Sequence, residues 1–377
     1  MAGAGSVHVR EPQDSTLEPG DSARTPQGSK TIKRTSAGIV ALLLIGVMMF
    51  LPTNFMIRSP GPVFNTLGED NGHDVVSIKG AETYPSDSVL DLLTIYVQGG
   101  GQNRITIPVV LEALINPTKD VVPEETIISR GVSSVEKNEQ NDFMMTSSQD
   151  LAVAAALTEL DEDFTEWLTV AEFSTDTNEK ALEPKDRLLK FEGKEITSLK
   201  ELKSDLNSHG AEPATLTVGR PDKHGVYSNT DVTVNTTEAE NGDRQLGVYL
   251  GAEYQFPIDV SFGLENVGGP SAGMMFALAI IDRLTEGSLA GDVHVAGTGE
   301  ITADGEVKPI GGIAQKMVAA KNAGATVFLA PADNCAEAVG RVPDGLNVIK
   351  VSTLSQARQA LEKISKGEDP KTFTTCE

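Results

Sequence analysis

The chain has 377 residues, 39% of them hydrophobic, and a formal net charge of −23 at pH 7. This length suits two or three modest domains, and the hydrophobic fraction is typical of a globular protein rather than of a polytopic membrane protein. A surface this acidic repels nucleic acid, so we expect no nucleic-acid partner.

Residues 35–57 form an apolar stretch without a charged side chain. A helix of this length would measure roughly 34 Å, against about 30 Å of hydrocarbon in a bilayer. Lys30, Lys33 and Arg34 precede the stretch, and only Arg58 follows closely. The positive-inside rule therefore predicts a single transmembrane helix with its N-terminus in the cytoplasm. A cleaved signal peptide is disfavoured, because no small-x-small site follows the apolar run.

Two segments flank this stretch. Residues 1–34 are polar and rich in Gly, Ser and Pro, which predicts a disordered cytoplasmic tail. Residues 58–160 are predicted to form a membrane-proximal α+β segment. Its runs LLTIYVQGG and RITIPVV are typical of strands, and SSQDLAVAAALTEL is typical of a helix capped by Ser147 or Ser148.

Residues 161–237 are predicted to form a separate small domain. RLLKF and ATLTVGR alternate like half-buried strands, and a helix is expected between them, because Ser198 and Glu201 form a capping box and Gly210 can end the helix. The element order and the phrase DRLLKFEGKEITSLKEL resemble a PDZ domain. Lys185 stands where such domains usually have Gly, so we expect a PDZ-like fold with weakened peptide binding; a structural spacer is the alternative.

Residues 245–364 alternate strand-like pieces (PIDVSF, DVHVAG, ATVFLAP) with helical ones (SAGMMFALAIIDRLT, GIAQKMVAAKNAG), which predicts an α/β domain. Residues 365–377 are expected to be a tail. The chain has two cysteines, Cys335 and Cys376. They are too few for a disulfide scaffold or a zinc cluster; one bridge between them is conceivable, but we expect two unpaired thiols.

The motif GGPSAG at residues 268–273 carries the first candidate for chemistry. Its glycines and Pro270 predict a constrained turn, after which Ser271 opens an apolar helix. A hydroxyl at a helix N-terminus lies beside unpaired N–H groups that can stabilise an oxyanion. Taken alone, Ser271 is more simply explained as a helix cap.

A nucleophilic serine needs a base. His294, between two valines, is predicted to be an ordinary strand residue. No HExxH, Cys/His cluster or phosphate-binding loop occurs in the sequence, so we expect neither a metal nor a nucleotide cofactor. Lys316 lies at the edge of a helical apolar stripe, and burial could make it a neutral base. Lys321 also borders apolar positions, and a surface lysine whose stem covers apolar groups is the simpler interpretation of either.

GGPSAG, TGEIT (298–302) and GEVKPIGGIAQK (305–316) together strongly resemble the proteolytic domain of Lon-type proteases. The resemblance implies an α/β Lon-type domain in which Ser271 is the nucleophile and Lys316 the base. It also implies that Thr298 helps to orient the lysine amine. Many Lon domains have Asp before GPSAG, where this chain has Gly268, which changes the lining of the cleft.

The whole arrangement is similar to the bacterial PDZ-containing Lon-like protease family. This implies a membrane-anchored serine endopeptidase that cleaves unstructured or membrane-proximal polypeptides outside the cytoplasm. The AAA+ ATPase module of full Lon is not seen in this sequence, and no nucleotide is expected. The alternative is a non-catalytic PDZ-bearing scaffold with a retired protease domain, against which the retention of Ser271 and Lys316 argues. Whether the chain forms a homo-oligomer stays open.

Overall fold

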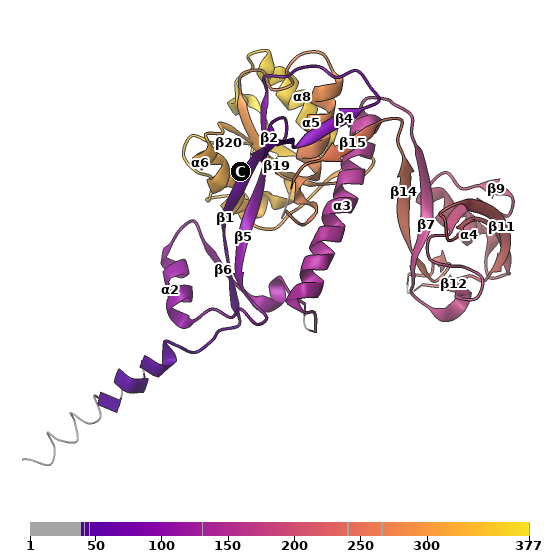
Figure 1. The fold of residues 1–377 in the computed structure, drawn as a ribbon, viewed down its shortest axis with the longest axis horizontal. Helices are drawn as coiled ribbons and strands as arrows, with labels where there is room; N and C mark the ends of the chain where they lie inside the picture. The colour runs from indigo at the N-terminus through magenta and orange to yellow at the C-terminus, as the bar shows by residue number, and fades with distance from the viewer. Residues whose placement is uncertain are drawn as a thin grey trace, which may run out of the picture.

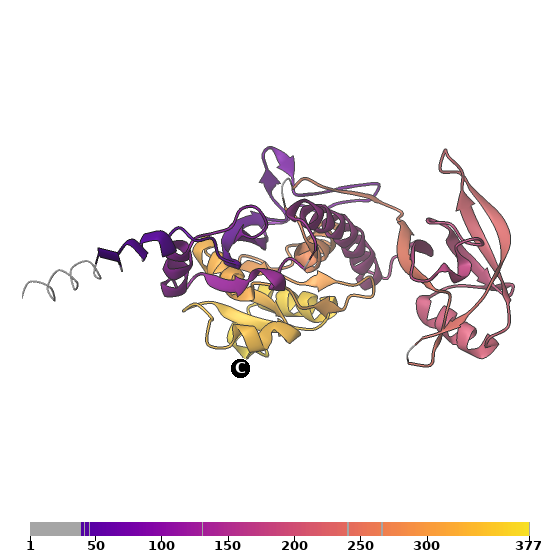
Figure 2. The ribbon, with the colours of Figure 1, turned by 90° about the horizontal axis from the view of Figure 1, so that it is seen from below.

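The structure is a computed structural model that describes residues 39–40, 42–44, 46–129, 131–239, 241–264 and 267–376. Figure 1 shows a larger body built on one mixed sheet and a smaller body at the right, joined to it by α3 (Ser134–Glu159) and by the strands that follow. Figure 2 shows the same separation from below.

The larger body contains a six-stranded sheet with strands from both the N-terminal and the C-terminal part of the chain. Its order is β20-β19-β16-β5-β1-β6, namely Asn347–Val351, Val327–Pro331, His294–Gly297, Val89–Gly99, Phe55–Asn65 and Asp120–Pro123. The strands β5, β16, β19 and β20 are mutually parallel, whereas β1 runs antiparallel to β5 and β6 antiparallel to β1. This sheet therefore joins segments that the sequence analysis placed in separate domains.

Helices cover both faces of this sheet, because alternate strand residues point to opposite sides. Leu92 of β5 and Leu329 of β19 belong to one core, with α3, α5 (Gly273–Leu284) and α8 (Leu354–Ser365) packed on them. Leu93 and Phe328 belong to the second core, under α6 (Ile313–Ala323) and the short α7 (Cys335–Ala338). The layers place α5 and α6 on opposite faces of the sheet.

Short two-stranded pairings complete the larger body. They are β2 (Glu69–Asp70) with β3 (His73–Asp74), β4 (Val76–Lys79) with β15 (Asp259–Phe262), and β17 (Glu300–Ile301) with β18 (Val307–Lys308). The TGEIT motif thus follows β16 directly and contains β17, the first strand of a short hairpin with β18.

The smaller body is an antiparallel sheet with one helix. Its order is β11-β10-β8-β7-β14, namely Tyr227–Val234, Ala214–Pro221, Arg187–Phe191, Thr165–Phe173 and Val248–Gln255. Further pieces are β9 (Lys194–Glu195), β12 (Thr237–Glu238), β13 (Arg244–Gln245) and α4 (Leu199–His209). Because β14 pairs with β7 over their whole lengths, the sheet of the smaller body includes residues beyond 245.

Local predictions in the smaller body hold at several positions. Ser198 caps α4 by accepting a hydrogen bond from the Glu201 N–H, and Gly210 ends the helix at a φ of 83°. Lys185, where a glycine was expected, has a φ of 75°, a left-handed conformation that costs a residue with a Cβ about 1–2 kcal/mol. The glycine preference at this position therefore has a backbone cause, and this chain tolerates the strain.

In the first segment one predicted strand and the start of one predicted helix were wrong. The run RITIPVV, expected as a strand, leads into α2 (Ile107–Ile115), because Pro108 sits in the first helical turn, where a missing N–H is harmless. The helix expected near Ser147 begins thirteen residues earlier, at Ser134, after a full capping box between Ser133 and Glu136. Its first half is polar and shows no apolar stripe, so the pattern did not reveal it.

The predicted transmembrane segment is described only in part. Residues 39–40, 42–44 and 46–48 are helical with exposed apolar side chains, whereas Phe55–Ile57 lies in β1, so the end of the predicted span was wrong. In the described parts of the chain, no helix is both long and apolar enough to cross a membrane. Residues 1–38, including the predicted tail, lie outside the described residues.

The expectation of two unpaired thiols was wrong, because Cys335 and Cys376 form a disulfide across 41 residues of chain. The Lys350 N–H donates to the Thr374 carbonyl at 2.9 Å, which ties the C-terminal residues to the edge strand β20. A chain-entropy estimate for a loop of this length gives about 4 kcal/mol of stabilisation. Sequence alone could not decide this pairing, because it depends on how the tail folds back.

Candidate active site

The GGPSAG motif forms the turn that precedes α5. A 3₁₀ turn, η3 (Pro270–Ala272), follows Gly269, whose φ of 88° requires a residue without a Cβ penalty. A Cβ on Gly268 would lie 3.1 Å from the Asn141 Cβ of α3 and 3.5 Å from the Asp142 carboxylate. The glycine that departs from the Lon pattern thus lets α3 approach this turn closely.

Helix α3 holds the turn through two hydrogen bonds. The Gly269 N–H donates to the Asn141 carbonyl at 2.8 Å, and the Ser148 hydroxyl donates to the Pro270 carbonyl at 3.0 Å. Ser148 is buried, with 1% of its surface exposed. The sequence analysis considered Ser148 only as a helix cap; the apolar run that follows it signals burial, but not which loop it would contact.

Lys316 reaches Ser271 from the opposite face of the sheet. The Lys316 Nζ lies 2.7 Å from the Ser271 Oγ and 2.8 Å from the Thr298 Oγ1. The structure thus brings together the three residues that the sequence singled out. Lys321, which the helical pattern could not distinguish from Lys316, instead contacts the Gly345 carbonyl at 3.2 Å near the surface.

Hydrogen-bond directions orient the lysine amine. The Thr298 hydroxyl donates to the Ser271 carbonyl at 2.9 Å, so its oxygen is left to accept an N–H from Lys316. The Gly299 N–H donates to the same carbonyl at 2.9 Å. With one N–H directed at Thr298, a neutral amine can direct its lone pair toward the Ser271 hydroxyl and accept its proton.

Burial makes the amine a base. Lys316 is 2% exposed, and this burial lowers its pKa from the ordinary value of 10.5 to about 7. Desolvation disfavours the ammonium form more than the neutral amine. A large share of Lys316 is therefore neutral near neutral pH, as a general base must be.

The backbone N–H of Ser271 is available for a negative oxygen. Ser271 follows Pro270 at the start of the 3₁₀ turn, so its N–H has no acceptor within that turn. The positive end of the α5 dipole adds to the same field. This geometry can stabilise an oxyanion that forms next to the Ser271 hydroxyl.

An open cleft of about 780 Å³ gives access to Ser271 and Lys316. Its walls come from the 267–272 turn, from β1, from β5 between Leu92 and Val97, and from the first half of α3, including Asn141 and Met145. Pairing of β5 with β16 ends at Leu92, so the cleft runs along a part of β5 that pairs with β1 on its other side.

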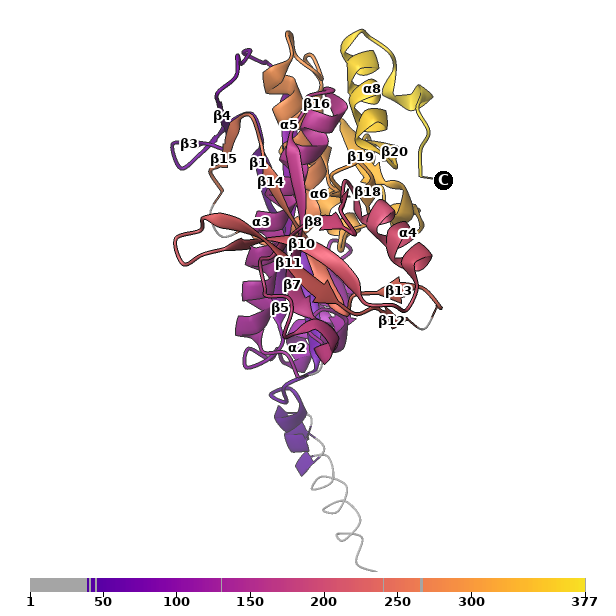
Figure 3. The ribbon, with the colours of Figure 1, turned by 90° about the vertical axis from the view of Figure 1, so that its right-hand side faces the viewer.

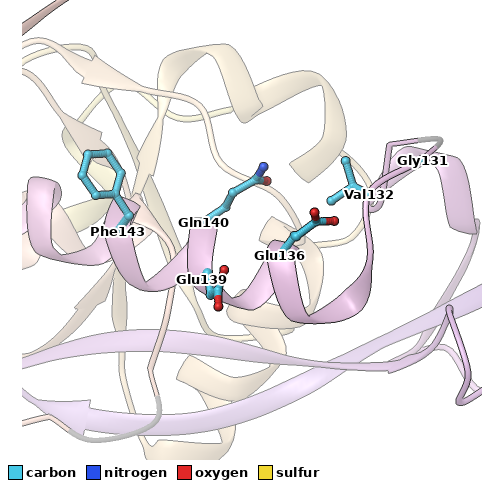
Figure 4. Close-up of a pocket in the computed structure, with 6 residues that line it drawn as sticks. All are labelled: Gly131, Val132, Glu136, Glu139, Gln140 and Phe143. Carbon is cyan, nitrogen blue, oxygen red and sulfur yellow. The ribbon is translucent and has the colours of Figure 1, made fainter. Parts of the chain in front are cut away.

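A second concavity lies away from the reacting groups. Figure 4 shows that Gly131 and Val132 come from the loop before α3, and that Glu136, Glu139, Gln140 and Phe143 come from its first turns. The Glu136 carboxylate accepts from the Ser133 N–H at 2.7 Å, which makes it part of the helix cap. The six residues that line this surface include no nucleophilic side chain next to a base, so it is not a second candidate active site.

His294 lies apart from the three residues. It occupies the start of β16, as expected, and its Nε2 lies 2.6 Å from the Asp91 Oδ2 on the neighbouring strand β5. Among the described residues, no group of three or more His, Cys, Asp or Glu side chains could hold a metal ion. The candidate chemistry therefore rests on Ser271, Lys316 and Thr298.

Comparison with known proteins agrees with this geometry. Residues 248–364 match the family described as Lon protease (S16) C-terminal proteolytic domain. The chain is 32% identical over 124 residues to Lon protease of Helicobacter pylori (strain J99) and 37% identical over 107 residues to Lon protease 1 of Bacillus subtilis (strain 168). These matches cover 32% and 28% of this chain, but only 15% and 14% of the relatives.

One solved structure is similar to a part of the chain. The PDZ domain of the SdrC-like protein from Listeria monocytogenes matches with 16% identity and a TM-score of 0.20, covering 22% of this chain and 86% of that domain. A score this low supports no argument about the fold. Together, the family match and the relatives show that residues 248–364 are similar to the C-terminal proteolytic domain of Lon proteases.

Proposed function

We propose that this protein is a serine endopeptidase in which Ser271 and Lys316 form the catalytic dyad. The observation that carries the proposal is the 2.7 Å contact between the Ser271 Oγ and a lysine nitrogen whose pKa burial lowers to about 7. Neutral Lys316 takes the proton of the Ser271 hydroxyl as its oxygen attacks the scissile carbonyl. The Ser271 N–H and the positive end of the α5 dipole stabilise the oxyanion.

The second half of the reaction uses the same groups. Protonated Lys316 gives its proton to the leaving amine, and an acyl-enzyme ester remains on Ser271. Water then enters the cleft, loses a proton to Lys316 and attacks the ester carbonyl. The bond from the acyl carbon to the Ser271 oxygen breaks, Lys316 returns the proton to that oxygen, and the second product leaves as a carboxylic acid. Thr298 contacts neither the scissile bond nor water in this scheme, and acts by keeping the amine directed at Ser271.

Extended polypeptides are the proposed substrates. The cleft follows β5 beyond Leu92, where the pairing with β16 has ended. An extended chain can add to such an edge as a further strand, with main-chain hydrogen bonds giving affinity. A folded domain offers no such segment, so cleavage is restricted to unstructured regions.

We further propose that the chain is anchored in a membrane by its apolar N-terminal stretch and acts outside the cytoplasm. Leu42, Leu43 and Phe50 are 70%, 64% and 82% exposed, a degree of apolar exposure that water disfavours. The Cys335–Cys376 disulfide favours an oxidising compartment. A reporter that is active only outside the cytoplasm, fused after Glu377, should be on, and one fused before Lys30 should be off; the reverse pattern contradicts the localisation.

The catalytic proposal is tested with the purified full chain in mild detergent, without nucleotide. It should cleave a casein-like unfolded protein, and intact-mass measurement with a slowly deacylating peptide ester should detect an acyl group on the peptide that contains Ser271. Ser271→Ala, which removes only the side-chain oxygen, should show neither activity nor adduct. Cleavage by Ser271→Ala at the wild-type rate would contradict the proposal.

A further inference from the structure

Helix α2 carries an apolar face that nothing in the described chain covers. Leu111, Leu114 and Ile115 are 52%, 63% and 85% exposed. Their spacing of three and four residues puts them on one side of the helix. The other side is occupied, because Val110 and Ala113 are buried in a small core with Ile57 and Ile105.

The position of α2 is fixed next to the proposed anchor. Pro52 forms a bridge with Thr106, the residue that precedes α2. The Thr53 N–H and hydroxyl both donate to the Ile105 carbonyl, at 2.8 and 2.9 Å. The start of α2 is thus bonded to the two residues that follow the exposed apolar stretch. Figures 1, 2 and 3 all place α2 beside the helical residues that end this stretch.

We propose that the face formed by Leu111, Leu114 and Ile115 lies in the headgroup region of the lipid bilayer that holds the anchor. This inference rests on the proposed anchoring. Nine helical residues measure about 13 Å, far too little to cross a bilayer, so α2 lies along its surface. The chain leaves the apolar stretch at Pro52, which brings α2 to the level at which the stretch ends.

The charges around α2 are compatible with a lipid contact that does not depend on electrostatic attraction. Glu112, at the border of the apolar face, is paired with Lys119 at 2.7 Å, so the helix presents a neutral rim. The chain as a whole is strongly acidic, and binding therefore depends on apolar contact and on the tether rather than on anionic lipid. A second contact beside a single tether restricts rotation of the catalytic body and fixes the orientation of its cleft relative to the membrane.

The contact is measured on the full chain reconstituted into phosphatidylcholine vesicles. Trp167→Phe removes the single native tryptophan, and Leu114→Trp then places one reporter on the apolar face. Lys223→Trp, in the exposed turn between β10 and β11 of the smaller body, is the matched control. Lipids with brominated acyl chains should quench the reporter at 114 at least twofold and leave the reporter at 223 unchanged.

The outcomes separate the two proposals. Vesicle flotation reports the anchor, and quenching reports α2. Protein that floats without quenching at position 114 overturns the α2 contact and leaves the anchor intact. Protein that does not float overturns the anchor and the contact together. An emission at 114 that shifts with protein concentration, and not with brominated lipid, shows that a second copy covers the face and also overturns the proposal.

A functional readout follows from the same contact. Replacing Leu111, Leu114 and Ile115 together by Ser changes exposed positions only, so the fold should remain. Cleavage of a peptide attached to the vesicle lipid should fall at least threefold, while kcat/KM for the same peptide free in solution should stay within twofold. Equal rates on the attached peptide for variant and wild type contradict the orientation argument.

Discussion

Asp186 in the smaller body and Lys316 in the larger body are both buried charged groups, but their hydrogen-bonding partners differ. In the smaller body, Asp186 is fully buried, yet both its oxygens accept hydrogen bonds from the Arg220 guanidinium, at 2.8 and 2.6 Å, and one also accepts from the Glu183 N–H. In the larger body, Lys316 has two neutral hydroxyls as its hydrogen-bonding partners, those of Ser271 and Thr298.

This difference separates a structural charge from a reactive one. A buried ion that meets a full set of opposite partners keeps its charge and holds elements together. A buried ion without a counter-charge destabilises the folded state. Its pKa shifts in the direction that favours the neutral form of the group. The second situation destabilises the fold, and it is typical of sites that need an unusual protonation state for chemistry.

The largest effect is expected from removing the reactive pair. Ser271→Ala and Lys316→Ala should each lower kcat/KM on an unfolded protein by at least about 10²–10⁴-fold. Lys316→Arg should be equally inactive, because a guanidinium stays charged and cannot take a proton. Lys321→Arg, on the same helix, is the control and should keep wild-type activity. A Lys316→Arg enzyme with more than a few per cent of activity rules out the lysine base.

Unfolding experiments should reveal opposite signs for the two buried charges. Arg220→Ala leaves Asp186 buried without its partner and should destabilise the smaller body by about 3–5 kcal/mol. The surface pair of Lys194 with Asp205 is the control, since Lys194→Ala should change the free energy of unfolding by less than about 1 kcal/mol. Denaturant titration at pH 7 measures both.

Lys316→Met should instead stabilise the protein, by on the order of 2–4 kcal/mol at pH 7. The unfolded chain binds a proton at this lysine up to about pH 10.4, whereas the folded chain releases it near pH 7, so the wild-type penalty is full below pH 7 and fades as pH rises toward 10.4. The gain from Lys316→Met should shrink over the same range. A gain that is independent of pH would show that packing, not charge, causes it.

A smaller loss of activity is expected at Thr298. Thr298→Val keeps the shape of the side chain and removes the oxygen that accepts from Lys316. A hydrogen bond to a charged or titrating group contributes about 1.5–3 kcal/mol, so kcat should fall about 10–100-fold. Thr298→Ser restores the oxygen and should recover most of the rate. If Val and Ser variants behave alike, the methyl packing of Thr298 matters and its hydroxyl does not.

The smallest effect is the pH dependence of the wild-type enzyme. The proposed mechanism requires neutral Lys316. Because the pKa of Lys316 is about 7, kcat/KM should rise about tenfold between pH 6 and pH 8 and then level off. His294→Ala should leave this profile unchanged, since His294 contacts Asp91 and lies outside the reacting group. A profile that changes in His294→Ala would assign the titration to the histidine.

The sequence singled out Ser271, Lys316 and Thr298, which the structure brings together, because their positions depend on local motifs. GGPSAG encodes a turn and a helix start, and the PIGG segment places Lys316 in the second turn of its own helix. The helical pattern alone could not decide which of Lys316 and Lys321 is the candidate base. Only the family resemblance distinguished them. Burial under β1 and β5, which lie far away in the sequence, is what makes them different.

The supports of the site were not predictable in the same way. Asn141 and Ser148 hold the turn from α3, and their contacts span more than a hundred residues of chain. The first half of α3 has no apolar periodicity, so the sequence pattern does not predict a helix there. The run before α2 is rich in β-branched residues, so the pattern predicts a strand. Tertiary packing of Val110 and Ala113 overrides that preference.

The interleaved sheet has a consequence for biosynthesis. Asp91 of β5 and its neighbour His294 of β16 are 203 residues apart, so the central pairing cannot form until most of the chain has been made. At about 5–20 residues per second, translation leaves β5 without that partner for about 10–40 s. Lys316 is synthesised later still, and it acquires its burial only when β5 and β1 close over its helix. The candidate site therefore stays unassembled until the chain has been translated past Lys316.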